Sequence, residues 1–476
     1  FEQGPAADFF TDPRRPETDN ELNITSPGTG EQDIIRVSYT GDKPIYLRGD
    51  IGVRFTGNSW ISPVKDVPMD WRGFGLEKNY RPCEMRVAHS LMTTLGYNAG
   101  DHITSSDITI DYLCDSSVVF LPPYTAEYSY FNNDRFNVYG DVVVRVNEDY
   151  GSVNTVQCTA LVPAYTNTDS SAVDIGKDSI AFIESCFDES YCTVDSIYNS
   201  VVPEMAGTVG VISTYSRFVN DNYTDVPSNS SARISRFRSE SGLAVKAEEV
   251  FNEQLGEEIY SQAIYKYTVA SIVADYLRDN YTYSLTAPID PNDPVMSFLN
   301  TVKSGHCSLY ASAMTLIMRE MGIPARYCTG FVADPANSGS PVVLKSKNLH
   351  AWCEVYIGEL GWVTFDPTSS SIYPSANNPT PPPASAAPQT TPATSTTPPR
   401  TSTPSRPEIS GVTDEPVSST ESVETEEGQG FDIKPFLPYI AVCAGIILIA
   451  AAAAAALCSL RELNRKARRS LNSLKK

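Results

Sequence analysis

Positive charge is scarce in this 476-residue chain, and this scarcity excludes one class of function. Lys and Arg together number 36 against 57 for Asp and Glu, so the formal net charge at pH 7 is −21. Proteins that bind nucleic acid need basic patches that neutralise phosphate groups. The composition therefore excludes nucleic acid as a partner. It agrees better with a soluble domain outside the cytoplasm, where acidity favours solubility or attracts basic substrates.

Histidine is also rare, with four residues in the whole chain. His89 and His102 have no cysteine pair and no second histidine at metal-ligand spacing. A dense cluster of calcium ligands is also absent from the sequence. We therefore expect these two histidines to be structural or exposed, and we predict no metal and no cofactor.

One long run without charge stands near the C-terminus. Residues 436–460 read FLPYIAVCAGIILIAAAAAAALCSL, and 25 residues of helix at about 1.5 Å each exceed the roughly 30 Å hydrocarbon core of a bilayer. The tail 461–476 that follows carries seven Lys or Arg residues against one Glu. The pattern predicts a transmembrane helix with a cytoplasmic C-terminus and an extracytoplasmic remainder.

The segment before this helix lacks the apolar residues of a core. Residues 371–430 are dominated by Pro, Ser and Thr and then become acidic, which predicts an extended, disordered stalk. At the other end, the numbered chain begins at Phe1 with no methionine and no apolar leader. We expect it to be a fragment or a processed form.

Residues 1–240 are expected to form a β-rich, sandwich-like extracytoplasmic domain. Short apolar or alternating segments lie between clusters of Gly, Asn, Asp and Pro. Cys186 and Cys192 enclose a loop short enough for a local disulfide in an oxidising compartment, while the pairing of the other cysteines stays open. The expected strands are 34–39, 45–47, 118–121, 141–146 and 156–162.

From about residue 247 apolar residues recur at steps of three and four residues, and this spacing predicts packing helices over 251–277 and 295–302. A further helix is expected over 307–321, since small and apolar residues line its faces and Gly322 and Pro324 follow it. Cys307 then lies at a helix N-terminus. The unpaired amides and the positive end of the helix dipole there favour a thiolate and can stabilise an oxyanion.

Three strands are expected after this helix, over 325–332, 350–357 and 362–365. His350 begins the second and lies on the same face as Trp352 and Glu354. Asp366 ends the third and could orient the imidazole. Each residue alone is more often structural than catalytic. Together, a thiol, a base and a carboxylate in these positions predict a catalytic triad of Cys307, His350 and Asp366.

The segments GHCSLYASAMTLIMREMGIPARYCTGF and HAWCEVYIGELGWVTFDPT resemble the core of the transglutaminase-like superfamily. The resemblance implies an α+β fold with a papain-like core over residues 247–370. It implies Cys307 as nucleophile, His350 as general base and acid, and Asp366 as the residue that orients the imidazole. Cys328 and Cys353 depart from the usual core residues and are either plain core or a cross-strand disulfide. His306 is expected at the rim of the site.

A second resemblance concerns YLRGDIGVRFTGNSW at residues 46–60 and FLPPY at 120–124. These segments are similar to the extracytoplasmic region of bacterial multi-pass membrane proteins that carry a transglutaminase-like domain. In such a layout, further membrane helices precede the point where this chain begins.

Taken together, the sequence predicts a membrane-anchored cysteine acyl-transfer enzyme that acts on protein or peptide amides, with the cell envelope as one expected source of substrate. An amine acceptor makes it a transglutaminase, and water makes it a protease or amidase. The alternative is a catalytically silent cell-surface binding or scaffold protein.

Overall fold

The computed structural model describes residues 21–24, 30–41, 43–63, 82–125, 135–164, 166, 173–189, 210–256, 261–333 and 341–368. All of them lie in the first of two compact units, residues 1–389. The predicted stalk (371–430), membrane helix (436–460) and tail (461–476) lie outside the described residues. Within the described part, no helix is both long and apolar enough to cross a bilayer.

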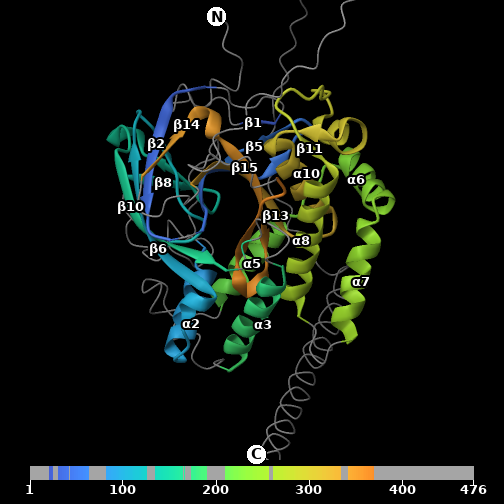
Figure 1. Ribbon diagram of the computed structural model, residues 1–476, viewed down its shortest axis with the longest axis horizontal. Coiled ribbons are helices and arrows are strands. Elements are labelled where there is room, and N and C mark those ends of the chain that lie inside the picture. The colour runs from blue at the N-terminus through green and yellow to red at the C-terminus, as the bar shows by residue number, and fades with distance from the viewer. Residues whose placement is uncertain are drawn as a thin grey trace, which may run out of the picture. The chain divides into compact units, whose positions relative to one another are not determined.

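A four-stranded antiparallel sheet lies at the centre of the fold (Figure 1). Its order is β16 (Trp362–Phe365), β15 (His350–Tyr356), β13 (Ala325–Ala333) and β3 (Ile45–Gly52). Every residue of these four strands is buried. Helix α10 (Cys307–Glu320) packs against β13 and β15. We call this the central sheet.

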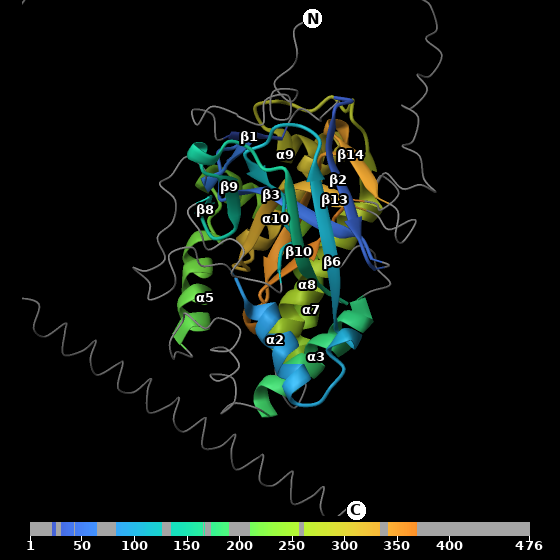
Figure 2. The same cartoon turned by 90° about the vertical axis from the view of Figure 1, so that its left-hand side faces the viewer.

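A second antiparallel sheet has the order β10 (Thr155–Pro163), β6 (Ile103–Tyr112), β2 (Asp33–Tyr39) and β14 (Val342–Lys345) (Figure 2). Buried and more exposed residues alternate along most of β6 and β10, as expected when one sheet face meets a core. A buried apolar cluster joins this sheet to the central one, because it contains Ile35 of β2, Ile110 of β6, Leu47 of β3 and Phe331 of β13.

Three smaller sheets complete the β-structure of the described residues. Strand β9 (Val143–Val146) pairs with β7 (Val118–Val119) and β8 (Phe136–Tyr139), and β5 (Ser59–Ile61) pairs with β1 (Glu21–Asn23) and β4 (Arg54–Phe55). The third is the parallel pair of β11 (Thr282–Tyr283) and β12 (Ser304–Gly305). The strands predicted over 34–39, 118–121, 141–146 and 156–162 correspond to β2, β7, β9 and β10.

The helices show where the sequence prediction needs correction. Residues 1–240 include α2 (Glu84–Thr94), α3 (Val173–Glu189), α5 (Gly210–Asn222) and α6 (Ser228–Glu240), so this half is mixed rather than β-rich. The helix expected over 251–277 is two helices. α7 (Leu243–Gly256) ends at the glycine, and α8 (Gln262–Asn280) begins after Ser261, whose hydroxyl accepts a hydrogen bond from the Ile264 amide.

The remaining helical segments are short. They comprise α9 (Pro294–Met296), the π turn Ser297–Val302 and the 3-10 turns Ala99–Asp101, Glu148–Tyr150, Ser346–Asn348 and Gly358–Leu360. The helix predicted over 307–321 is present as α10. It stops before Gly322, whose φ of +71° lies in the region that glycine adopts most readily.

The expected boundary near residue 240 does not separate two modules. Strand β3 pairs with β13 over seven positions, from Tyr327↔Gly52 to Ala333↔Ile45. In addition, the Trp60 indole donates a 2.9 Å hydrogen bond to Ser312 of α10. The prediction of a separate N-terminal sandwich is therefore wrong, because this half of the chain supplies an edge strand and packing residues to the same core.

Candidate active site

Cys307 is the first residue of α10 and is buried, with 7 % of its surface exposed. The chain reaches it from β12 through His306, whose backbone is extended (φ −109°, ψ 173°). Gly305 makes this approach possible, since a Cβ there would lie 2.6 Å from Leu309 and 3.0 Å from Phe298. The thiol therefore sits where helix amides and the helix dipole favour a negative charge.

His350 begins β15 opposite Gly330 of β13. Its Nε2 lies 2.6 Å from Oδ2 of Asp366, which directly follows β16. The two side chains are buried, and Asp366 has no exposed surface. With Nε2 facing the carboxylate, the other ring nitrogen is left for the thiol.

The Asp366 carboxylate accepts four hydrogen bonds from side chains and backbone, and the Asp366 backbone carbonyl accepts a fifth. Oδ2 accepts one from the Tyr46 hydroxyl at 2.9 Å in addition to that from His350. Oδ1 accepts two from Thr368, from its amide at 2.9 Å and from its hydroxyl at 2.6 Å. The Arg278 guanidinium donates to the backbone carbonyl of Asp366. The carboxylate is thus fixed in position on both oxygens.

The pKa values of Cys307 and His350 shift in opposite directions. Burial raises the pKa of the Cys307 thiol, but hydrogen bonds from His306 and His350 and their charges outweigh it and lower the pKa to about 6. Burial lowers the pKa of His350, but the charge and hydrogen bond of Asp366 and the contact with Cys307 raise it to about 10. Between these values the pair is a thiolate and an imidazolium.

Two further side chains at the thiol were not assigned a role from the sequence. His306 was expected at the rim, yet it is buried, with 4 % exposed, and its hydrogen bond lowers the pKa of Cys307. Tyr283 of β11 lies beside Gly305. Burial and then the charge and hydrogen bond of Cys307 raise the pKa of its phenol, so it remains a neutral O–H donor.

The structure brings together all three residues predicted to form the triad. It also adds three tyrosine or histidine side chains, Tyr46, Tyr283 and His306. Only His306 carried a signal in the sequence, through its place next to Cys307. Tyr46 and Tyr283 reach the site through strand pairing, which local sequence patterns do not specify.

Cys328 and Cys353 are free thiols, so the cross-strand disulfide is excluded and the plain core interpretation is confirmed. Cys328 pairs with Trp352, whereas Cys353 pairs with Tyr327. Neighbouring residues of a strand point to opposite faces, so the two thiols lie on opposite sides of the central sheet. Cys186 is buried in α3, and its predicted partner Cys192 lies outside the described residues.

The described residues contain no group of three or more His, Cys, Asp or Glu side chains that could hold a metal ion. The acid, base and thiol of the site contact one another instead. This arrangement can perform nucleophilic acyl chemistry with its own side chains.

Comparison with known proteins places the site in a family. Residues 253–367 match the sequence model of the Transglutaminase-like superfamily. This part of the chain belongs to that superfamily. The predicted resemblance is thereby confirmed, and its core falls within the region expected from residue 247 to residue 370.

Two curated relatives are similar to this chain over a stretch of comparable length. The protein YebA of Bacillus subtilis is 39% identical over 112 residues, which is 22% of this chain and 15% of the relative. A protein-glutamine gamma-glutamyltransferase of Pseudomonas aeruginosa is 35% identical over 101 residues, or 21% of this chain and 15% of the relative. The match thus spans less than a fifth of either relative.

Among solved structures, the periplasmic domain of TgpA from Pseudomonas aeruginosa bound to ethylmercury is similar with a TM-score of 0.41 and 15% identity. The alignment covers 73% of this chain and 95% of that one. A second structure of the TgpA periplasmic domain is similar with a TM-score of 0.38 and 15% identity.

Proposed function

We propose that this chain is a membrane-anchored, extracytoplasmic acyl-transfer enzyme that acts on protein or peptide amides through Cys307. The observation that carries the proposal is the juxtaposition of a thiol at a helix N-terminus with a histidine held 2.6 Å from a buried carboxylate. The superfamily of residues 253–367 supports transfer chemistry. Membrane anchoring is supported by the apolar run 436–460 and the basic tail after it.

In the first half of the reaction, the Cys307 thiolate attacks the carbonyl carbon of a carboxamide or peptide bond. Helix amides and the neutral Tyr283 hydroxyl beside Cys307 would stabilise the oxyanion that forms. The His350 imidazolium then gives its proton to the nitrogen as the C–N bond breaks. Ammonia or an amine leaves, and a thioester remains on Cys307.

In the second half, neutral His350 accepts a proton from the incoming amine or water, which attacks the thioester carbon. Collapse of that intermediate breaks the C–S bond and restores the thiolate and imidazolium. An amine acceptor yields a new amide crosslink, and water yields a carboxylate. One relative is named as a protein-glutamine gamma-glutamyltransferase, and this name supports glutamine side chains as the acyl donors that we propose for this chain.

The test follows ammonia release by the full chain from a pool of glutamine-containing proteins, with and without a labelled primary amine. Ammonia together with amine incorporation supports crosslinking, whereas new N-termini support proteolysis. Cys307→Ala should abolish either product. Cys328→Ala removes a buried thiol of β13 and should leave product formation intact. Equal product from the wild type and Cys307→Ala would instead favour a catalytically silent surface protein.

A further inference from the structure

Tyr46 contacts the site from a part of the chain far outside the superfamily match. It lies in β3, 320 positions before Asp366, and its hydroxyl donates a 2.9 Å hydrogen bond to Oδ2 of that residue. The ring is buried, with 4 % exposed. Oδ2 is the oxygen that also faces His350 Nε2. One carboxylate oxygen is therefore held between the base and the tyrosine.

The ring of Tyr46 also supports the surroundings of the imidazole. It packs edge to face on Trp352, with centroids 5.1 Å apart and an interplanar angle of 67°. Trp352 in turn lies nearly parallel to the His350 ring, at 6.3 Å and 19°. Tyr46 thus touches both the carboxylate that binds His350 and the indole beside it.

Two features fix β3 so that Tyr46 cannot shift along the sheet. Gly330 allows the close approach of the strands, since a Cβ there would lie 2.0 Å from the Leu47 carbonyl oxygen. Two residues after Tyr46, Nη1 of Arg48 donates to both oxygens of Glu354 at 2.8 and 2.7 Å. The register of β3 against β13 and the ion pair of Arg48 with Glu354 together fix the position of the Tyr46 hydroxyl.

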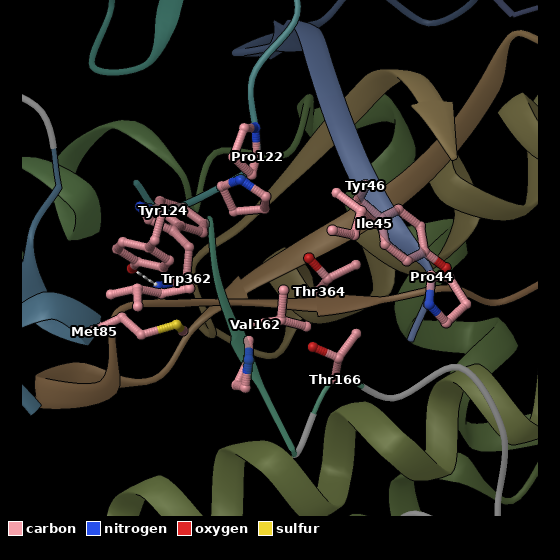
Figure 3. A pocket seen from close by; sticks show the side chains of 13 residues that line it. Pro44, Ile45, Tyr46, Met85, Pro122, Tyr124, Val162, Thr166, Trp362 and Thr364 are labelled. Atoms are coloured by element: carbon pink, nitrogen blue, oxygen red, sulfur yellow. Dashed lines mark hydrogen bonds between the residues drawn. The ribbon is translucent and has the colours of Figure 1, made fainter. Parts of the chain in front are cut away.

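Tyr46 also lines a small pocket, where Figure 3 shows it with Pro44, Pro122, Trp362 and Thr364. Loss of the Tyr46 hydroxyl would leave Oδ2 of Asp366 with the hydrogen bond from His350 but without that from Tyr46. A carboxylate with one donor on that oxygen is held less firmly.

We propose that Tyr46 is a positioning residue of the reaction, which fixes Asp366 and, through it, the imidazole of His350 beside Cys307. This inference rests on the proposed function of the triad. It also makes β3 a part of the catalytic unit, although the superfamily match begins at residue 253. The charged and titratable groups beside Asp366 include His350, Arg278, Tyr46 and Tyr283.

The test measures the alkylation rate of Cys307 by iodoacetamide against pH in the full chain, with the modified site identified by mass spectrometry. Tyr46→Phe keeps the ring and its packing. In this variant we expect the acid limb of the pH–rate profile to move to higher pH by about one unit, because His350 stabilises the thiolate less well. Alkylation on the acid side should therefore be about tenfold slower than in the wild type.

The matched control is Tyr223→Phe. The Tyr223 hydroxyl donates a 2.7 Å hydrogen bond to the buried carboxylate of Asp141, so the substitution removes a comparable interaction away from the thiol. Its acid limb should match that of the wild type. An equal shift in both variants would overturn the proposal, since it would reflect a general loss of packing.

A double-mutant cycle with Asp366→Asn tests whether Tyr46 acts through Asp366. In that background Tyr46→Phe should change the alkylation rate less than twofold, and a full further shift would contradict the proposal. If the acid limb of Tyr46→Phe lies at the same pH as that of the wild type, the role of Tyr46 is overturned and the proposed function is not. If the acid limb of the wild type itself lies at the pKa of an ordinary thiol, the proposed function is contradicted.

Discussion

Arg326 and Glu354 form a buried ion pair, with Nη2 of the arginine 2.6 Å from Oε2 of the glutamate. Arg48 donates to the same carboxylate from β3, and the Arg326 guanidinium lies 3.9 Å over the Trp362 ring. Arg326 also pairs with Asp141 at 2.8 Å. These contacts link β3, β13 and β15 on the face of the central sheet that also carries His350.

Glu354→Gln should strongly destabilise the fold, because it leaves Arg48 and Arg326 buried without their shared counter-charge. We expect a loss of about 3–5 kcal/mol in the free energy of unfolding, measured by urea denaturation. Asp293→Asn breaks the more exposed pair with Arg233 and should change the free energy by less than about 1 kcal/mol. Equal effects of both substitutions would contradict the role given to the buried network.

The same carboxylate should contribute to acid unfolding. Burial raises the pKa of Glu354, but the charges and hydrogen bonds of Arg48 and Arg326 lower it to about 2. The folded-state pKa is therefore below the unfolded value, and the contribution to stability is complete above about pH 4.5 and lost as the pH falls towards 2.

Glu84 should have the opposite effect on stability. Its Oε1 accepts a hydrogen bond from Tyr356 at 3.2 Å, while Oε2 is buried with no hydrogen-bond partner in the described part of the chain. Burial raises its pKa to about 7. Because this is above the unfolded value, the folded state loses stability as the pH rises from about 4.5 to 7.

Glu84→Gln removes the buried charge and should reduce this loss. We expect the variant to gain stability relative to the wild type across that pH range, reaching about 3 kcal/mol above pH 7. Thermal unfolding at pH 5 and pH 8 measures the difference. Glu31→Gln changes an exposed carboxylate and should leave the difference in stability between pH 5 and pH 8 as in the wild type. A Glu84→Gln profile parallel to that of the wild type would show that the carboxyl does not titrate there.

Tyr283→Phe separates acyl transfer from simple thiol reactivity. A neutral phenol beside Cys307 can donate to the oxyanion, which forms in acyl transfer and not in alkylation. We expect amide turnover to fall about 100-fold while alkylation by iodoacetamide stays within about twofold at about pH 8, where the Cys307 thiol is ionised with or without the Tyr283 hydroxyl. Tyr281→Phe, whose hydroxyl donates to the Leu299 carbonyl, is the control and should affect neither rate. A parallel fall in both rates would place Tyr283 in thiolate formation instead.

Gly330→Ala should disturb the pairing of β13 with β3. The new Cβ would meet the Leu47 carbonyl oxygen at 2.0 Å, and backbone cannot move aside as a side chain does. We expect a loss of about 2–4 kcal/mol in unfolding free energy, together with slower Cys307 alkylation as Tyr46 shifts. Gly100→Ala meets only Asn98 at 3.4 Å and serves as the control. A stable variant with wild-type alkylation would contradict the account of β3.

The sequence predicts those parts of the site that depend on local pattern. Helix α10 follows from its apolar spacing and from Gly322 and Pro324 after it, and strands β15 and β16 follow from runs of apolar residues. The motif segments around Cys307, His350 and Asp366 carry the resemblance to the family.

The contribution of β3 could not be predicted in this way. Its pairing with β13 joins residues far apart in the chain, and strand periodicity is the same whichever partner a strand takes. The local pattern predicts a strand over 45–47, but it does not show that this strand joins the central sheet. The roles of Tyr46 and Arg48 depend on that pairing and became visible only with the fold.

The most direct test of an activated nucleophile at Cys307 is the pH dependence of its alkylation in the wild-type full chain. We expect a thiolate that forms with a pKa of about 6 and requires His350, so that His350→Ala moves the acid limb of the pH–rate profile to higher pH. Cys328 and Cys353, whose pKa values are raised by burial, serve as unreactive internal controls. A limb near 8.5 for Cys307, as in an ordinary thiol, would contradict an activated nucleophile at this site.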